Sequence, residues 1–509
     1  MRPSRWAWAL VAVAELGGAT ARGQTTPTGS RYLAIDHWAY QYIARLRDRG
    51  YLANIDPLAQ PVRRQDVARA LVGLDPDSLS GPVAAWVRML QEELAPELEG
   101  IAGQGRRSYG FTGAVGGRAS TSQRLDPARP VGDEGGWPWW RAGAWVETGP
   151  IAVETRLYGD TYFNDDPDGR NPGQPRGGRS DNAYLSVQLP RVALDVGRFQ
   201  RNWAPLGTSG LAVSGVATPY TSLGMKLDLG RFVLRAFTAE LDTALGQKRY
   251  LSAHELSYRG GESFFLSLGE SVLYASQRGG LSLRYLNPME FLFFDLENEP
   301  ADLTANLMLS AQVWARKGPL VVRGELALDD LSLFPPGDTA VAPARYALDL
   351  GLVWARPHSP FTLSAGYRQV SSFAYRTSTG VDRYTYLDRG LGDNFADYDR
   401  LTLSLEFTPP GGALILAPTL LAQRQGEGGV REPFPAVYDD FLNSPWLFLG
   451  VRETTYRAAL RGRLQPLRQL WLGWDLGPNW VRNQAHVAGR RATEFQATGE
   501  IGFRLQFPH

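Results

Sequence analysis

The side chains best suited to chemistry in this sequence are a group of aromatic and charged residues in the stretch 371–398. Tyrosines and phenylalanines interleave there with arginines and aspartates. Aromatic rings can pack against the C–H faces of a sugar, while charged groups take hydroxyl or carboxylate groups. The stretch therefore predicts either a ligand-binding loop or a plainer structure, an aromatic girdle beside an ordinary solvated loop.

Sequence signatures of enzymes and metal sites are missing. The five histidines are scattered, and no metalloprotease, serine-hydrolase, phosphate-loop or dinucleotide-binding motif occurs. The chain has no cysteine, which excludes disulfides, thiolate metal ligands and a cysteine nucleophile. We therefore expect no enzymatic activity, no cofactor and no metal, although a Ser/His pair supplied by two different strands would not be visible in the sequence.

One acidic segment, 164–169 (Asn-Asp-Asp-Pro-Asp-Gly), loosely matches the start of a calcium-binding loop, with oxygen ligands at alternate positions before a glycine. The twelfth position of that loop would be Pro175 in place of the chelating glutamate. A solvated acidic turn is the better interpretation.

The charge balance shows no sign of nucleic-acid binding, because the net charge of the 509 residues is only +1, and we expect no nucleic-acid partner. Three of the 53 basic residues are lysines: Lys226, Lys248 and Lys317. An arginine excess suits carboxylate or phosphate binding. A GC-rich genome explains it equally directly, and we favour that reading.

The first 23 residues have the parts of a secretory signal peptide. Arg2 and Arg5 precede a nine-residue apolar run, and Ala19-Thr20-Ala21 offers a cleavage site. That run is too short to cross a bilayer as a helix, and no 18-residue apolar run occurs elsewhere. We expect an exported protein that is either soluble or a barrel.

Residues 24–104 are expected to form a small periplasmic helical domain of three helices. Asp36 can cap the first helix and Gly50 can end it, the second extends from about Pro61 to Leu71, and the third starts near Pro82. Pro96 should discourage continuation of the third helix. The stretch 36–68, with Asp36-His37-Trp38-Ala39, Gly50-Tyr51-Leu52 and Pro61 to Ala68, resembles one S-layer-homology-like repeat. The resemblance implies docking on a cell-wall polymer, and a structural cap under a barrel is the alternative.

From residue 105 to residue 509 the period of the hydrophobic pattern changes to two, as in a transmembrane β-strand with lipid on one side and a wet lumen on the other. The last segment shows it best, since apolar residues from Phe495 to Phe507 alternate with polar ones. Short connections also alternate with long ones, as in outer-membrane barrels. Counting up and down gives a closed barrel of about 18 antiparallel strands, with both termini periplasmic.

The predicted lumen face carries both signs of charge. This favours a paired network in a wet interior, with a track for an acidic polysaccharide as the functional alternative. The residues are Glu154, Arg156, Asp195, Arg235, Arg323, Glu325, Arg345, Asp349, Glu406, Arg457, Arg461, Glu500 and Arg504. The long loop 271–302 contains Phe291-Leu292-Phe293-Phe294, so it should fold inward as a constriction or pack onto the barrel rim.

Several motifs between residues 197 and 330 resemble the Wzi-type capsule-assembly family of outer-membrane proteins. The strand-and-loop segment Gly197 to Ser214 resembles it, with Trp203-Ala204-Pro205 where the family pattern has Trp-Gly-Pro. The segments Ser267 to Tyr274, Leu283 to Pro288 and Glu325 to Asp330 extend the match. The order of signal, helical bundle and barrel also agrees. The resemblance implies a non-enzymatic surface lectin that retains capsular polysaccharide.

We therefore predict a monomeric barrel in the bacterial outer membrane, surrounded by lipid, that binds or anchors surface polysaccharide. The predicted polysaccharide-binding residues are Arg198, Arg201, Trp203, Tyr375, Arg376, Arg383, Tyr384, Tyr386, Asp393 and Tyr398. Two alternatives stay open. One is a passive porin or substrate channel, and the other is a structural tether whose helical domain holds cell-wall polymer.

Overall fold

The computed structural model describes residues 29–102, 108–169, 177–276, 279–294, 304–329, 343–435, 440 and 442–508. The expected signal peptide (1–23) and the expected domain boundary at 104/105 lie outside these residues. In the described part, no helix has both the length and the apolar character needed to cross a membrane.

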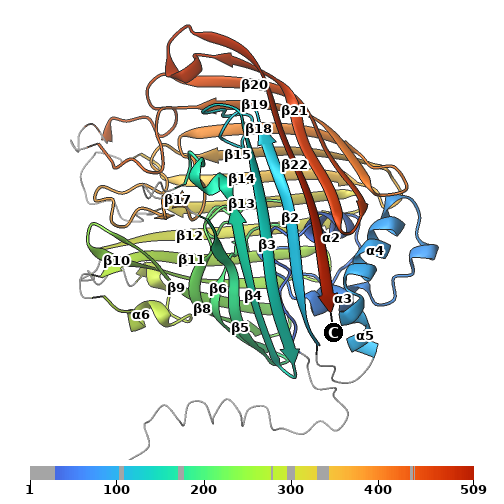
Figure 1. Ribbon diagram of the computed structural model, residues 1–509. Coiled ribbons are helices and arrows are strands. Elements are labelled where there is room, and N and C mark those ends of the chain that lie inside the picture. Colours follow the sequence, from blue (N-terminus) through green and yellow to red (C-terminus); the bar gives the residue numbers. More distant parts are fainter. Residues whose placement is uncertain are drawn as a thin grey trace, which may run out of the picture.

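Eighteen antiparallel strands close into a transmembrane barrel, which confirms the predicted fold and strand number (Figure 1). The strands are β2 (Ser108–Ser120), β3 (Gly135–Thr148), β4 (Ile151–Asp160), β5 (Arg179–Gln188), β6 (Val192–Phe199), β8 (Tyr220–Asp228), β9 (Phe232–Ala244), β10 (Gln247–Arg259), β11 (Phe264–Ser276), β12 (Thr304–Lys317), β13 (Leu320–Asp329), β14 (Tyr346–Ala355), β15 (Phe361–Val370), β18 (Tyr398–Phe407), β19 (Leu414–Gln425), β20 (Glu453–Leu467), β21 (Leu470–Arg482) and β22 (Arg491–Pro508). The first and last strands pair with each other, for example Gly116 with Gly502. Closure leaves the sheet without an edge, as a spanning sheet requires in lipid.

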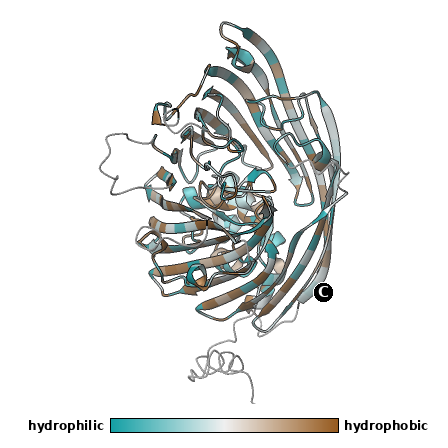
Figure 2. Cartoon of the chain, turned by 90° about the vertical axis from the view of Figure 1, so that its left-hand side faces the viewer, coloured by the Kyte–Doolittle hydropathy of each residue, from teal (hydrophilic) through white to brown (hydrophobic). Residues whose placement is uncertain are grey.

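The outer surface of the barrel is apolar because alternate residues of each strand point outward. In β22, Phe495, Ile501 and Phe503 are exposed whereas Gln496 is buried. Figure 2 shows the same alternation of hydrophobic and hydrophilic residues along the strands. The period-two pattern of the sequence thus becomes a lipid-facing surface and a polar inner wall.

The two ends of the barrel differ in the length of their connections. At one end, here called the turn end, the strands are joined by residues 149–150, 189–191, 229–231, 260–263, 318–319, 356–360, 408–413 and 468–469. At the other, the loop end, long connections include 121–134, 161–178, 200–219, 371–397 and 426–452. The loop end also has two short connections, 245–246 and 483–490.

The described part of the helical domain has four α-helices, one more than predicted: α2 (Ala39–Asp48), α3 (Arg64–Leu71), α4 (Pro82–Glu93) and α5 (Ala95–Ala102). The fourth forms because Pro96 stands in its first turn, where a missing amide hydrogen breaks no helical bond. Apolar side chains of the other three helices, among them Tyr42, Val67 and Leu90, meet in one core. The second helix starts at Arg64, not at Pro61.

This domain occupies the turn end of the barrel (Figure 1). It makes ion pairs with six strands spread round the barrel wall. The pairs are Asp36 with Arg141 and Arg156, Arg45 with Glu406, Asp48 with Arg323, Asp56 with Arg235, and Glu93 with Arg504. Asp36 therefore does not cap α2, whose N-cap is Trp38. Burial opposes ionisation of Asp36, but the guanidinium groups of Arg141 and Arg156 hold its pKa well below the usual range.

Candidate functional site

Loop 200–219 leaves the loop end and crosses the interior of the barrel. Although it joins β6 to β8, its backbone is held by strands on other parts of the wall. The Leu211 amide donates to Oε1 of Glu325 in β13 at 2.8 Å, and Arg368 in β15 donates to the Ser209 carbonyl at 2.9 Å. Gln312 in β12 donates to the Trp203 carbonyl at 2.9 Å. Only a segment inside the lumen can reach these three strands.

Loop 371–397 packs on loop 200–219 from the loop end. The Tyr375 hydroxyl donates to the Leu211 carbonyl at 2.7 Å, and the Tyr384 hydroxyl donates to the Ala212 carbonyl at 2.9 Å. The contact between the two loops is close at Gly392, where a Cβ would come within 2.0 Å of the Leu211 carbonyl oxygen. The aromatic residues of this loop thus form part of an apolar core inside the barrel.

The helical domain meets loop 200–219 from the opposite side. Its two-residue strand β1 (Ala59–Gln60) pairs with β7 (Asn202–Trp203), and the Leu206 amide donates to the Pro57 carbonyl at 2.7 Å. Trp203 and Ala59 belong to the same apolar core as Tyr375 and Tyr384. Segments from both ends of the barrel therefore pack against each other within the lumen.

The ten predicted site residues divide by burial. Seven are buried: Arg201, Trp203, Tyr375, Arg376, Tyr384, Asp393 and Tyr398. The rings of Tyr375 and Tyr384 are fully buried, so they contact no ligand in this conformation. The three half-buried residues are Arg198, Arg383 and Tyr386. Six of the seven support the packed loops, whereas the side chain of Arg201 lies against Phe199, Phe237 and Ser222 of the barrel wall. The binding role of all ten stays a prediction.

Asp393 illustrates this supporting role. Its carboxylate accepts from Arg368 at 2.9 Å and from the Tyr398 hydroxyl at 2.8 Å. Burial opposes ionisation, but the Arg368 guanidinium and the hydrogen bond from Tyr398 keep the pKa of Asp393 below its ordinary value. The carboxylate therefore stays charged and ties loop 371–397 to β15 and β18.

Three arginines join neighbouring loops at the loop end, and we call Arg383, Arg389 and Arg431 the arginine cluster. Arg431 donates to the Asp388 carbonyl at 3.0 Å and to the Pro167 carbonyl at 3.4 Å, and Arg383 donates to the Arg431 carbonyl. Arg389 pairs with Asp166. Sequence reasoning singled out Arg383 but missed Arg389 and Arg431, because nothing in the sequence indicates that loops 161–178, 371–397 and 426–452 meet.

In the part of the chain that the structure describes, Arg383 and Arg431 form no ion pair with a carboxylate. Among the described residues, their guanidinium groups bond only to backbone carbonyls, which do not neutralise a full charge. Arg431 is exposed, and Arg383 and Tyr386 are half-buried. The cluster can therefore offer forked donors to an acidic ligand arriving from the loop end.

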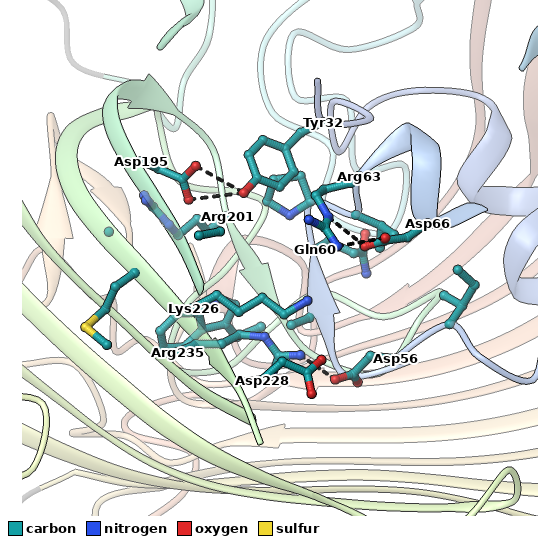
Figure 3. A pocket seen from close by; sticks show the side chains of 18 of the residues that line it. Tyr32, Asp56, Gln60, Arg63, Asp66, Asp195, Arg201, Lys226, Asp228 and Arg235 are labelled. Carbon is teal, nitrogen blue, oxygen red and sulfur yellow. Dashed lines mark hydrogen bonds and ion pairs between the residues drawn. The ribbon is translucent and has the colours of Figure 1, made fainter. Parts of the chain in front are cut away.

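A second candidate site is a cavity of about 360 Å³ between the helical domain and the wall at the turn end, here called the turn-end cavity (Figure 3). Arg201 and Trp203 line it. Burial opposes ionisation of Asp56, but Arg235 and the Leu58 amide lower its pKa to about 2.

Most other charges of the predicted lumen face are paired, as the network interpretation expected. Arg457 and Arg461 share Asp475 at 2.7 and 2.9 Å, and Asp349 accepts from Arg368 at 2.9 Å. In the acidic segment 164–169, Asp165 accepts from Trp137 at 2.7 Å and Asp168 pairs with Arg124 at 2.9 Å. These carboxylates are engaged by protein donors.

The described part of loop 271–302 does not enter the lumen. Tyr285 and Leu292 pack on Tyr250 and Tyr274, whose neighbours Leu251 and Leu273 are the residues that face the luminal core. Residues 279–294 therefore lie on the outward side of β10 and β11, which is the rim alternative of the prediction. Residues 277–278 and 295–303 lie outside the described residues.

Solved structures similar to this chain are outer-membrane barrels. One is Wzi, titled an outer membrane protein involved in group 1 capsule assembly in Escherichia coli and a carbohydrate binding beta-barrel. It is 13% identical, with a TM-score of 0.62 over 93% of this chain and 99% of that chain. Acinetobacter baumannii OccAB2 is 9% identical, with a TM-score of 0.45 over 79% of this chain and 98% of that chain. Pseudomonas aeruginosa OprD is also 9% identical, with a TM-score of 0.44 over 78% of this chain and 95% of that chain.

No protein-family model matches the chain, and no curated protein sequence matches it. At 13% identity the likeness to Wzi shows a shared fold, which confirms the predicted Wzi-like barrel at that level. The S-layer-homology-like repeat stays a prediction.

Proposed function

We propose that this protein is a non-enzymatic barrel of the bacterial outer membrane that binds an acidic surface polysaccharide at its loop end. The observation that carries the proposal is the arginine cluster, which three joined loops hold in place. Two of its members, Arg383 and Arg431, have no carboxylate partner among the described residues. A guanidinium fork matches a sugar carboxylate with two parallel hydrogen bonds. The turn end, with the helical domain, would then face the periplasm.

The packing inside the barrel favours binding over passive diffusion. The helical domain and loops 200–219 and 371–397 pack against one another within the lumen, where a general porin keeps a water-filled channel. The role of Wzi as a carbohydrate-binding barrel agrees with the proposal. Buried residues such as Tyr375 and Tyr384 would act by holding the loops in place, and Arg383, Tyr386, Arg389 and Arg431 would touch the polysaccharide.

A glycan array with the full chain, purified in detergent, tests the proposal. Acidic polysaccharides should bind and neutral ones should not. The double variant Arg383→Ala/Arg431→Ala should weaken binding about tenfold or more, because charge-assisted hydrogen bonds contribute about 1.5–3 kcal/mol each.

The matched control is Arg490→Ala, which removes another exposed arginine at the loop end, between β21 and β22, and should leave binding unchanged. Absence of binding to any glycan, or equal binding by the double variant, would contradict the proposal.

A further inference from the structure

The turn-end cavity contains more positive charge than its own carboxylates balance. Six cationic side chains line it: Arg63, Arg69, Arg201, Lys226, Arg235 and Arg259. Four carboxylates line it: Asp56, Asp66, Asp195 and Asp228. The wall of the cavity therefore has a formal excess of two positive charges.

Three of the carboxylates are already occupied by arginines. Asp66 pairs with Arg63 at 2.8 Å, Asp228 pairs with Arg259 at 3.1 Å, and Asp56 pairs with Arg235. The fourth, Asp195, accepts from the Tyr32 hydroxyl at 3.1 and 3.2 Å (Figure 3). Arg69 lies 3.8 Å from Asp66 and shares that carboxylate with Arg63. The two other cations of the cavity, Lys226 and Arg201, have no ion pair among the described residues.

Lys226 projects into the cavity from β8, toward the side where Gln60 and Asp66 lie (Figure 3). Within the described residues, its ammonium group has neither a hydrogen bond nor an ion pair. A partly buried ammonium without a partner costs free energy, so lysine is seldom kept in such a place without a counter-ion.

Arg201 is the second unmatched cation, and it is held rigidly. Its guanidinium lies 4.0 Å from the centre of the Phe199 ring and 4.5 Å from that of Phe237, and it donates to the Ser222 hydroxyl at 2.8 Å. Aromatic packing orients the group but does not neutralise it. Among the described residues it forms no ion pair with a carboxylate.

We infer that the turn-end cavity binds a carboxylate-bearing sugar, with Lys226 and Arg201 as the partners of the carboxylate. The polar groups of Gln60, Asp195 and Asp228 around them match sugar hydroxyls. The same carboxylates oppose a dianionic phosphate, which favours a monoanion. The volume of about 360 Å³ lies in the range of small-molecule sites.

This inference does not rest on the proposed function, because the cavity lies at the other end of the barrel from the arginine cluster. Two sources of such a sugar are open to a cavity at the turn end: a uronic acid unit of a polysaccharide, or the lactyl-bearing sugar of cell-wall glycan whose stem peptide has been removed. The first carries its carboxylate directly on the sugar ring, and the second carries it on the lactyl ether.

The experiment is isothermal titration calorimetry of the detergent-purified full chain with glucuronate and with N-acetylmuramate, and with glucose and inorganic phosphate as comparisons. We expect one of the two sugar acids to bind, and its identity distinguishes the two sources. Glucose should not bind, and phosphate should bind more weakly than the sugar acid. Binding to the Arg383→Ala/Arg431→Ala variant should equal binding to the unmodified chain.

Lys226→Met keeps about the length of the side chain but removes its charge. It should weaken binding of the sugar acid at least tenfold. Its thermal midpoint should equal or exceed that of the unmodified chain, because it removes an unpaired cation, so lost binding will not reflect unfolding. Lys248→Met is the control, since Lys248 lies at the loop end, paired with Glu240 at 2.5 Å. Failure of both sugar acids to bind, phosphate binding as tightly as either, or unchanged binding in Lys226→Met would overturn the inference.

Discussion

His37 connects the helical domain to the last strand of the barrel through a buried cluster of charges. Its Nδ1 accepts from the Ala39 amide at 3.1 Å, and its Nε2 lies beside Arg504 and 3.4 Å from Oε1 of Glu93. Burial and the nearby Arg504 guanidinium lower the pKa of His37 to about 3. The imidazole therefore stays neutral while the domain is docked.

Acidification should weaken docking of the helical domain through His37. A detached His37 has a pKa near 6.5 and takes up a proton below it, whereas the docked residue, with a pKa of about 3, does not. The stabilisation is complete above pH 6.5 and is lost as the pH falls toward 3, with about 2 kcal/mol lost between pH 7 and pH 5. Protease sensitivity of residues 29–102 in urea, measured at both pH values, should show this loss. His37→Gln should flatten the dependence, and an equally steep dependence in that variant would refute the assignment.

A second link between the helical domain and the barrel is the ion pair of Arg45 in α2 with Glu406 in β18. Two nitrogens of Arg45 donate to Glu406 at 2.8 and 2.6 Å, and both side chains are largely buried. Glu406→Gln leaves the arginine charge without compensation, so docking should lose about 3 kcal/mol. The midpoint of urea-induced protease sensitivity reports it. Asp77→Asn breaks the exposed pair of Asp77 with Arg88 and should change nothing measurable; equal effects of the two substitutions would contradict the role of burial.

At the scale of elements, very short segments join parts of the molecule that are far apart in the sequence. The pair β1–β7 is two residues long, yet it joins the helical domain to a loop of the barrel. Likewise, the close contact at Gly392 lets loop 371–397 lie against loop 200–219. These contacts form because strands of the barrel wall hydrogen-bond to loop 200–219 and fix its position in the lumen.

Residues 279–294 are an element of opposite character, because they lie on the outside of the wall with apolar side chains turned away from it. Phe291 is 69% exposed. We expect this element to extend the lipid-facing surface, since an apolar patch of this kind is unfavourable in water. The chain has no native cysteine, so Phe291→Cys can carry a single polarity-sensitive fluorophore.

In proteoliposomes the label at position 291 should emit as in hydrocarbon and be quenched by acyl-chain nitroxides. The control is Val72→Cys, which is 58% exposed but lies on the helical domain, and its label should emit as in water. A water-like emission at position 291 would rule out contact with lipid.

The whole molecule is a barrel whose lumen contains a packed apolar core. The apolar core that includes Ala59, Trp203 and Tyr384 contains residues from the helical domain, both inward loops and the wall. Close packing leaves no room for a wide water channel between the side chains of this core.

We therefore expect planar bilayers containing the protein to show little or no steady current, whereas a general porin of 16–18 strands conducts through an aqueous channel. The Gly392→Leu variant should add current, because its side chain would push the two inward loops apart. A large and steady current from the unmodified chain would favour the channel alternative.

The sequence determined where the strands lie, which faces they turn to lipid, and how many there are. The first two properties depend on the period of two along each strand, which is local in the sequence. The closure of the sheet follows from a general requirement, because lipid leaves no backbone group unpaired. The apolar faces of the helices around Tyr42 and Leu90 also follow a local period, that of 3.6 residues. The extra helix α5 was missed because proline breaks a helix interior but is accommodated in a first turn.

Only the tertiary structure decided which loops fold inward and which charges meet. The partners Arg45 and Glu406 are 361 positions apart, and Tyr384 and Ala212 are 172 apart. No periodicity connects such distant positions, since their meeting depends on barrel closure. For this reason the sequence marked the aromatic residues of 371–398 as distinctive. Only the fold showed that Tyr375 and Tyr384 lie inside the lumen, while arginines of loops 371–397 and 426–452 lie together at the loop end.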